Sequence, residues 1–120
     1  MSYDARLAER IRAAVKDIRG VSEKPMFGGI AWMKGGHMFV GTLKDELMVR
    51  VGKDAHDAAV ARPHARIMDF TGKPMRGYVV VAPRGVATVA QVRPWVERAL
   101  ANVATLPTKR PVKKRATRKR

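Results

Sequence analysis

The last fourteen residues carry the densest set of chemically active side chains. Residues 107–120 hold eight Lys or Arg and no acid, whereas the first 106 residues hold 17 basic and 10 acidic side chains. A cationic segment of this kind can follow a phosphate backbone without reading base sequence. We therefore expect non-specific association with nucleic acid through Lys109, Arg110, Lys113, Lys114, Arg115, Arg118, Lys119 and Arg120.

The same segment is not expected to fold. It contains Pro107 and Pro111 and no apolar face, which predicts a disordered basic tail, residues 107–120, after a folded domain of residues 1–106. The tail has no aromatic side chain on which bases could stack. The alternative is a tail that only improves solubility, attached to a protein-interaction or homodimerisation adaptor. Methionines suit adaptable partner surfaces as well as cores, and the relevant ones are Met26, Met33, Met38, Met48, Met68 and Met75.

A second candidate is the loop around Asp69. Side chains such as Asp and Thr cap the amides of turns, so a plain turn is the simpler interpretation. Loops also carry many binding sites. The functional alternative is a ligand site rimmed by Asp69, Thr71, Lys73, Arg50 and Arg66.

Catalytic, metal and cofactor chemistry is not indicated. The chain has no cysteine, and His37, His56 and His64 are not spaced as metal ligands. We find no nucleophile–base pair, no usefully spaced carboxylates and no glycine-rich nucleotide motif. The expectation is a small non-catalytic binding or regulatory domain with no metal and no cofactor.

The hydrophobic periodicity predicts the elements that must position these residues. They are a helix over 3–19, strands over about 26–33, 37–43 and 47–51, a short helix over 54–61, strands over 67–70 and 76–82, and a helix over about 88–105. The order α-β-β-β-α-β-β-α predicts a two-layer α+β fold, with helices on one face of an antiparallel sheet.

Two positions disturb this pattern. Gly28 and Gly29 fall inside the first expected strand, which indicates a bulge or a close approach of two backbones. Pro94 falls inside the last expected helix. Because proline breaks helix interiors, we expect a separate initial turn at Thr88 and a main helix beginning near Pro94.

The charge at the N-terminus and the length of the apolar runs bear on the cellular location. The N-terminus is charged where a secretion signal would be apolar, and the apolar run at residues 78–82 is far shorter than the roughly 18 residues of a membrane span. We expect a cytoplasmic protein without membrane contact.

Several ordered motifs resemble the N-terminal domain of the TfoX/Sxy family over roughly residues 3–106. They are Lys24-Pro25-Met26-Phe27-Gly28-Gly29-Ile30-Ala31-Trp32-Met33, Leu47-Met48-Val49-Arg50-Val51-Gly52, Arg62-Pro63-His64-Ala65-Arg66, Met68-Asp69-Phe70-Thr71-Gly72-Lys73-Pro74-Met75, Gly77-Tyr78-Val79 and Trp95-Val96.

The resemblance implies a fold like that of the secretion chaperones and no catalytic residues. Full-length members of the family regulate natural competence, and are thought to act beside a cyclic-AMP receptor protein on its promoters. They also carry a helical C-terminal domain, for which residues after Leu106 offer no counterpart. We therefore expect a single-domain member that resembles the competence regulators.

Overall fold

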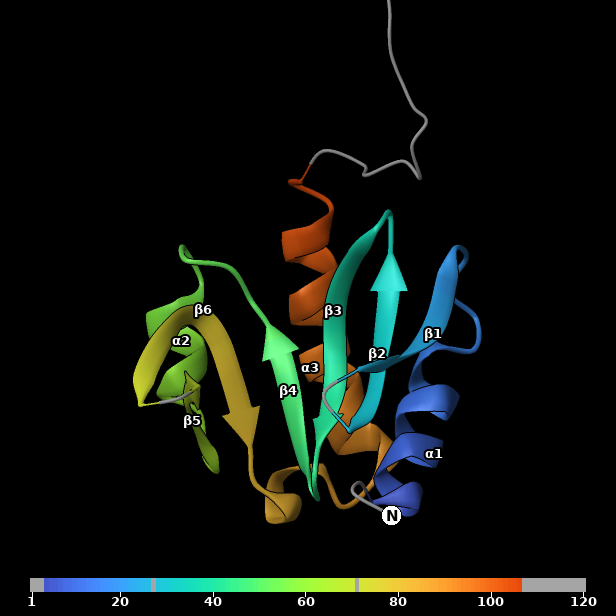
Figure 1. Ribbon diagram of the computed structural model, residues 1–120, viewed down its shortest axis with the longest axis horizontal. Coiled ribbons are helices and arrows are strands. Elements are labelled where there is room, and N and C mark those ends of the chain that lie inside the picture. Colours follow the sequence, from blue (N-terminus) through green and yellow to red (C-terminus); the bar gives the residue numbers. More distant parts are fainter. Residues whose placement is uncertain (1–3, 27, 71, 107–120) are drawn as a thin grey trace, which may run out of the picture.

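The computed structural model describes residues 4–26, 28–70 and 72–106. These residues form a six-stranded antiparallel sheet, with strand order β1-β2-β3-β4-β6-β5, and pack helices against it (Figure 1). In chain order the elements are α1 (Ala5–Val15), β1 (Val21–Met26), β2 (Gly29–Lys34), β3 (His37–Leu43), β4 (Glu46–Arg50), α2 (His56–Val60), β5 (Ala65–Phe70), β6 (Lys73–Val81), the 3-10 helix η1 (Pro83–Val86) and α3 (Val89–Val103).

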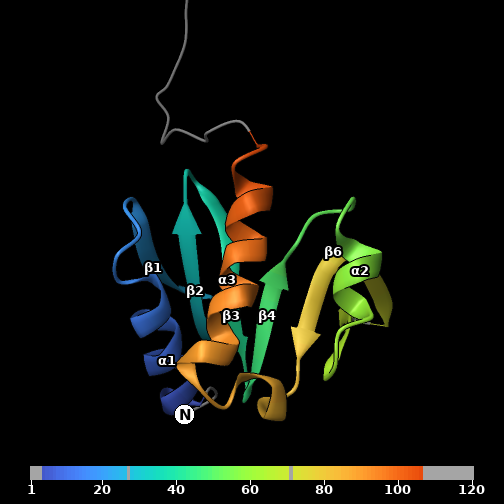
Figure 2. The same ribbon diagram turned by 180° about the vertical axis from the view of Figure 1, so that it is seen from behind.

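The α-helices all lie on one face of the sheet. Figure 2 shows α3 crossing β3 and β4, with α1 near β1 and β2 and α2 near β6 at the far side. The predicted α+β class is therefore confirmed. The structure adds one strand, β1, ahead of the first expected strand, so that four strands separate α1 from α2.

The glycine pair closes a hairpin instead of lying inside a strand. Gly28, at a φ of 76°, follows β1, and Gly29 begins β2. A Cβ atom on Gly29 would lie 2.9 Å from the carbonyl oxygen of Thr42 in β3. The Ile30 N–H also donates to Thr42 Oγ1 at 3.0 Å. The predicted close approach of two backbones is confirmed for Gly29. The predicted start of the strand near residue 26 was wrong, because the turn falls at Gly28 and β2 begins at Gly29.

Helix α3 runs without a break through Pro94, so the predicted separate turn is wrong. At its start, Thr88 Oγ1 accepts from the Gln91 N–H at 3.2 Å, and Gln91 Oε1 accepts from the Thr88 N–H at 3.2 Å. This capping box fixes the first turn. Val92 and Trp95 are buried on either side of Pro94, whose own ring is exposed, so packing holds the helix across the proline.

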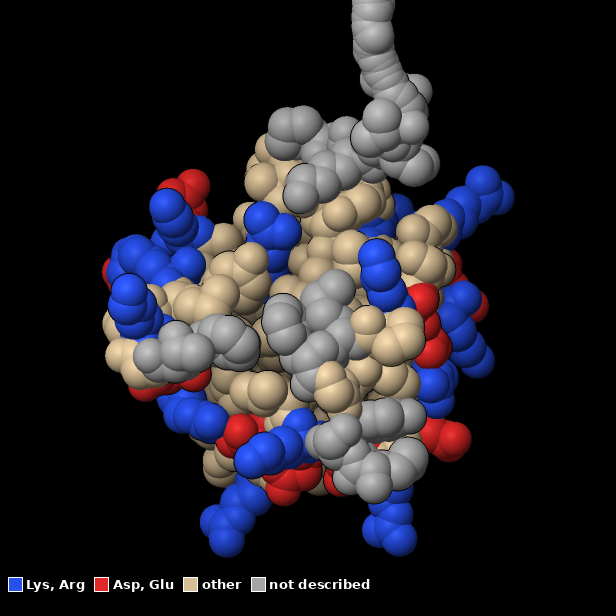
Figure 3. Space-filling model, viewed as in Figure 1, with Lys and Arg blue, Asp and Glu red and all other residues tan. Residues whose placement is uncertain are grey.

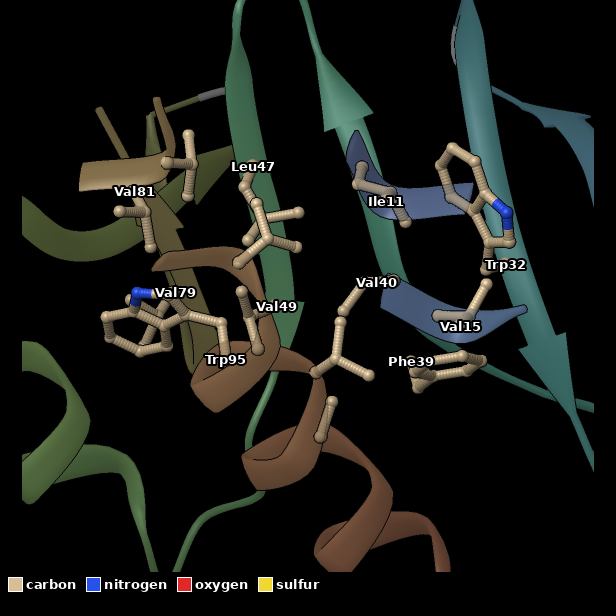
Figure 4. Packing of buried hydrophobic residues seen from close by; sticks show 14 of the residues in the cluster. Ile11, Val15, Trp32, Phe39, Val40, Leu47, Val49, Val79, Val81 and Trp95 are labelled. Carbon is tan, nitrogen blue, oxygen red and sulfur yellow. The ribbon is translucent and has the colours of Figure 1, made fainter. Parts of the chain in front are cut away.

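The main core lies between the sheet and the helices. Figure 4 shows Trp32, Phe39 and Val49 of the sheet facing side chains of α1 and α3. Because side chains alternate along a strand, Met48 points to the opposite face. There it packs with two other buried side chains in a second apolar cluster, formed by Met48, Met68 and Val80.

In the described ranges, no helix combines the length and the apolar character needed to cross a lipid bilayer.

Candidate functional site

The structure distributes the residues of the predicted ligand loop along two strand pairs. Asp69 pairs with Pro74, and Lys73 pairs with Phe70, at the end of the β5–β6 hairpin. Arg50 instead pairs with Tyr78, five residues beyond Lys73 on β6. Thr71, the remaining member of the loop, lies outside the described residues. The hairpin end and Arg50 are therefore separate parts of the sheet.

Arg66 is engaged in an ion pair. Its guanidinium donates to the two carboxylate oxygens of Glu46 at 2.6 and 2.9 Å. Glu46 belongs to β4 and Arg66 to β5, so this pair bridges over β6, which lies between them. Hydrogen bonding to Glu46 raises the pKa of Arg66 above its ordinary value. Arg66 thus ties three strands together.

Arg50 lines a cavity of about 470 Å³ at the C-terminal end of α3. The walls come from the end of β4, the segment that follows it, the middle of β6 and the last turns of α3. We call this cavity the basic pocket and define it by six lining residues whose side chains can donate hydrogen bonds, namely Arg50, Lys53, Arg76, Tyr78, Arg98 and Asn102.

Two glycines shape the wall of the basic pocket. Gly52 and Gly77 have φ values of 86° and 95°, a region that favours glycine. A Cβ atom on Gly52 would collide with the side-chain amide of Asn102. The Gly77 carbonyl accepts from the N–H groups of Val51 and Gly52 at 2.9 and 3.0 Å. The Nδ1 atom of the buried His56 accepts from the Gly77 N–H at 2.9 Å. This hydrogen bond holds the Gly77 part of the wall from its buried side.

Two of the pocket guanidiniums lie over aromatic rings. The Cζ atom of Arg50 is 5.8 Å from the ring centre of Tyr78, and that of Arg98 is 5.5 Å from the ring centre of Trp95. These are cation–π distances. The rings therefore restrict where both guanidiniums can point.

The basic pocket has more positive than negative charge. Among the described residues that line it, Asp54 is the one acid, against four cations. A guanidinium nitrogen of Arg76 lies 3.4 Å from a carboxylate oxygen of Asp57, and both side chains are mostly exposed. Within the described chain, Arg50, Lys53 and Arg98 have no carboxylate oxygen within 4 Å. The surplus charge is therefore available to an anion.

Figure 3 shows the sheet face without helices. Lys and Arg side chains gather at its upper left, over the segment after β4 and the bend of β6, while uncharged atoms dominate the described middle of the face. Lys53, Arg76 and Arg98, which line the basic pocket, were not predicted from the sequence as site residues. The available signals were Gly52 directly after a strand and the four-residue spacing of Arg98 and Asn102 on a helix.

The histidines do not gather. His37 and His56 are buried, whereas His64 is exposed at a φ of 68° in the turn before β5. In residues 4–26, 28–70 and 72–106, no three His, Asp or Glu side chains lie close enough together to hold a metal ion.

The Lys/Arg segment, residues 107–120, lies outside the described residues, so the predicted contacts of its eight cations stay a prediction. Its attachment point is defined, because Leu106, the last described residue, lines the basic pocket.

Comparison with known proteins places this fold in a family. No curated protein and no solved structure gives a significant match. The sequence profile described as the TfoX N-terminal domain matches residues 13–103, a range that runs from α1 to the last residue of α3. The chain therefore belongs to the TfoX N-terminal domain family.

Proposed function

We propose that the protein is a non-catalytic binding or regulatory domain that associates with nucleic acid through its Lys/Arg segment, residues 107–120. The observation that carries this proposal is the charge distribution, with eight cations and no acid in fourteen residues that follow a domain of moderate charge. Phosphates attract such a segment whatever the base sequence.

The folded domain supports a binding role over a catalytic one. His56, a buried side chain that could transfer protons, is occupied by the Gly77 N–H and supports the fold. The membership of the TfoX N-terminal domain family defines the domain but assigns no reaction. Binding by the segment needs no chemistry beyond ion pairing and the release of counterions.

The expected affinity depends steeply on salt. If about six cations neutralise phosphates of a duplex, the slope of log K against log salt is near −5. Raising the salt from roughly 50 to 200 mM then weakens binding about a thousandfold.

The test is a fluorescence anisotropy titration of a labelled random-sequence duplex with the full chain, at several salt concentrations. The segment variant carries Lys113→Gln, Lys114→Gln, Arg115→Gln and Lys119→Gln. A matched control loses the same charge at exposed positions of the folded domain, through Arg6→Gln, Lys16→Gln, Lys24→Gln and Arg93→Gln.

The segment variant is expected to flatten the slope by about 3, because roughly three phosphate contacts are lost. The control should keep nearly the slope of the unaltered protein. Equal flattening in the two variants would show that total charge, and not the segment, determines binding. Light scattering of the full chain without nucleic acid tests the adaptor alternative, which requires self-association or a captured partner.

A further inference from the structure

The basic pocket has the dimensions of a site for one small ligand. Its volume of about 470 Å³ falls in the range of roughly 300–1,000 Å³ usual for such sites. Its wall is fixed before any ligand arrives, because the Gly77 main chain is hydrogen bonded to Val51, Gly52 and His56. A preformed hollow loses little entropy on binding.

The polar groups of the basic pocket are donors that suit phosphate. Three of the lining residues, Arg50, Arg76 and Arg98, carry guanidinium groups, and a guanidinium's fork of N–H donors matches phosphate oxygens. Lys53 adds an ammonium group, and the Asn102 side chain adds an amide. With four cations against one carboxylate, the lining favours a doubly charged anion over a singly charged one.

The lining also includes apolar residues and one aromatic residue. Val51, Ala101 and Leu106 contribute aliphatic surface, and the Tyr78 ring lies beneath Arg50. A bare inorganic phosphate would leave this surface unused. A ligand that joins a phosphate to a sugar and a flat base would contact both kinds of surface.

We propose that the basic pocket binds the phosphate monoester of a nucleoside, either as a free mononucleotide or at the 5′ end of a nucleic-acid strand. This is a second site, distinct from the Lys/Arg segment, which follows the backbone without a pocket. Leu106, the last described residue, lies on the rim, and residues 107–120 follow it in the sequence.

The test is isothermal titration calorimetry of the full chain with adenosine 5′-monophosphate. Adenosine serves as the uncharged comparison. The pocket variant combines Lys53→Gln with Arg76→Gln, two exposed side chains whose loss spares the core. The matched control combines Arg62→Gln with Arg84→Gln, which are exposed and lie outside the pocket. The two variants lose the same charge.

We expect the monophosphate to bind at least tenfold more tightly than adenosine. The pocket variant should lose about tenfold or more in affinity for the monophosphate, as removal of charged hydrogen bonds implies, and the control should lose less than twofold. No detectable binding, equal affinities for the two ligands, or equal losses in the two variants would overturn the proposal.

Two further arms distinguish the source of the phosphate and separate this site from the segment. In the segment variant described above, a single strand with a 5′-phosphate is compared with the same strand ending in a 5′-hydroxyl. A preference for the phosphorylated strand that the pocket substitutions abolish assigns the site to strand ends. Binding of the monophosphate without that preference assigns it to free nucleotides. The segment variant should still bind the monophosphate, so failure of either proposal can be recognised alone.

Discussion

Replacing His56 by alanine tests the connection between the fold and the basic pocket. The His56 side chain is 4% exposed, and its Nδ1 accepts the Gly77 N–H at 2.9 Å. His56→Ala leaves that buried N–H without a partner, which costs about 1–3 kcal/mol. Loss of the buried ring and the resulting cavity add about 1–2 kcal/mol. We expect the free energy of unfolding to fall by about 3 kcal/mol.

The assay is urea unfolding of the full chain, followed by circular dichroism, with thermal unfolding as a second measurement. A loss of this size lowers the melting temperature by roughly 10–20 °C for a domain of about 100 residues. His56→Asn retains an acceptor near the position of Nδ1 and should recover about 1 kcal/mol of the loss.

His64→Asn provides the control, because His64 is exposed and its positive φ suits asparagine. Its effect should stay within about 0.5 kcal/mol. A loss below about 1 kcal/mol in His56→Ala, or an equal loss in His64→Asn, would refute the argument from burial and hydrogen bonding.

Two other predictions concern β1 and β2. Gly29→Ala should cost at least about 2 kcal/mol in urea unfolding, because its Cβ would press on the Thr42 carbonyl and disturb the hydrogen bond to Thr42 Oγ1. Gly72→Ala is the control, because a Cβ atom on Gly72 would meet nothing within 4 Å. It should cost only the roughly 1 kcal/mol of a positive φ. Equal losses of stability in Gly29→Ala and Gly72→Ala would contradict the steric account. The hydrogen bond from Arg12 holds the pKa of Glu23 below its ordinary value, so the charged carboxylate stabilises the fold at neutral pH. Glu23→Gln should therefore lower stability by less than about 1 kcal/mol at pH 7, since the pair is exposed, and the difference should vanish as the pH falls below about 4. An equal difference at pH 7 and pH 3 would exclude this cause.

The sequence predicted the elements that bury apolar side chains. Helix α3 carries a periodic apolar pattern and strand β6 a continuous apolar run, and both were placed within a few residues of their observed bounds. Strand β1 was missed because Ser22, Glu23, Lys24 and Pro25 are all exposed, so no alternation of apolar and polar residues marks it. An edge strand of this composition cannot be told from a loop by pattern alone.

The basic pocket could not be predicted for a different reason. Arg50, Arg76 and Arg98 are far apart in the chain, and they meet only because β4 pairs with β6 and α3 packs across the sheet. Arg66 was expected on a ligand rim but forms an ion pair with Glu46, a partner twenty residues away. Local spacing carries no information on such contacts, whereas the three-residue spacing of Thr88 and Gln91 is itself the pattern of the observed capping box.

The exposed composition of β1 has a consequence for molecules that are crowded together on one polyanion. Among the described strands, β1 pairs with β2 alone, so its other side is open to a neighbouring copy. Pro25 has no amide hydrogen to offer an incoming strand, and Glu23 and Lys24 would have to give up water there. Copies brought close by their cationic ends should thus remain discrete instead of joining their sheets into aggregates.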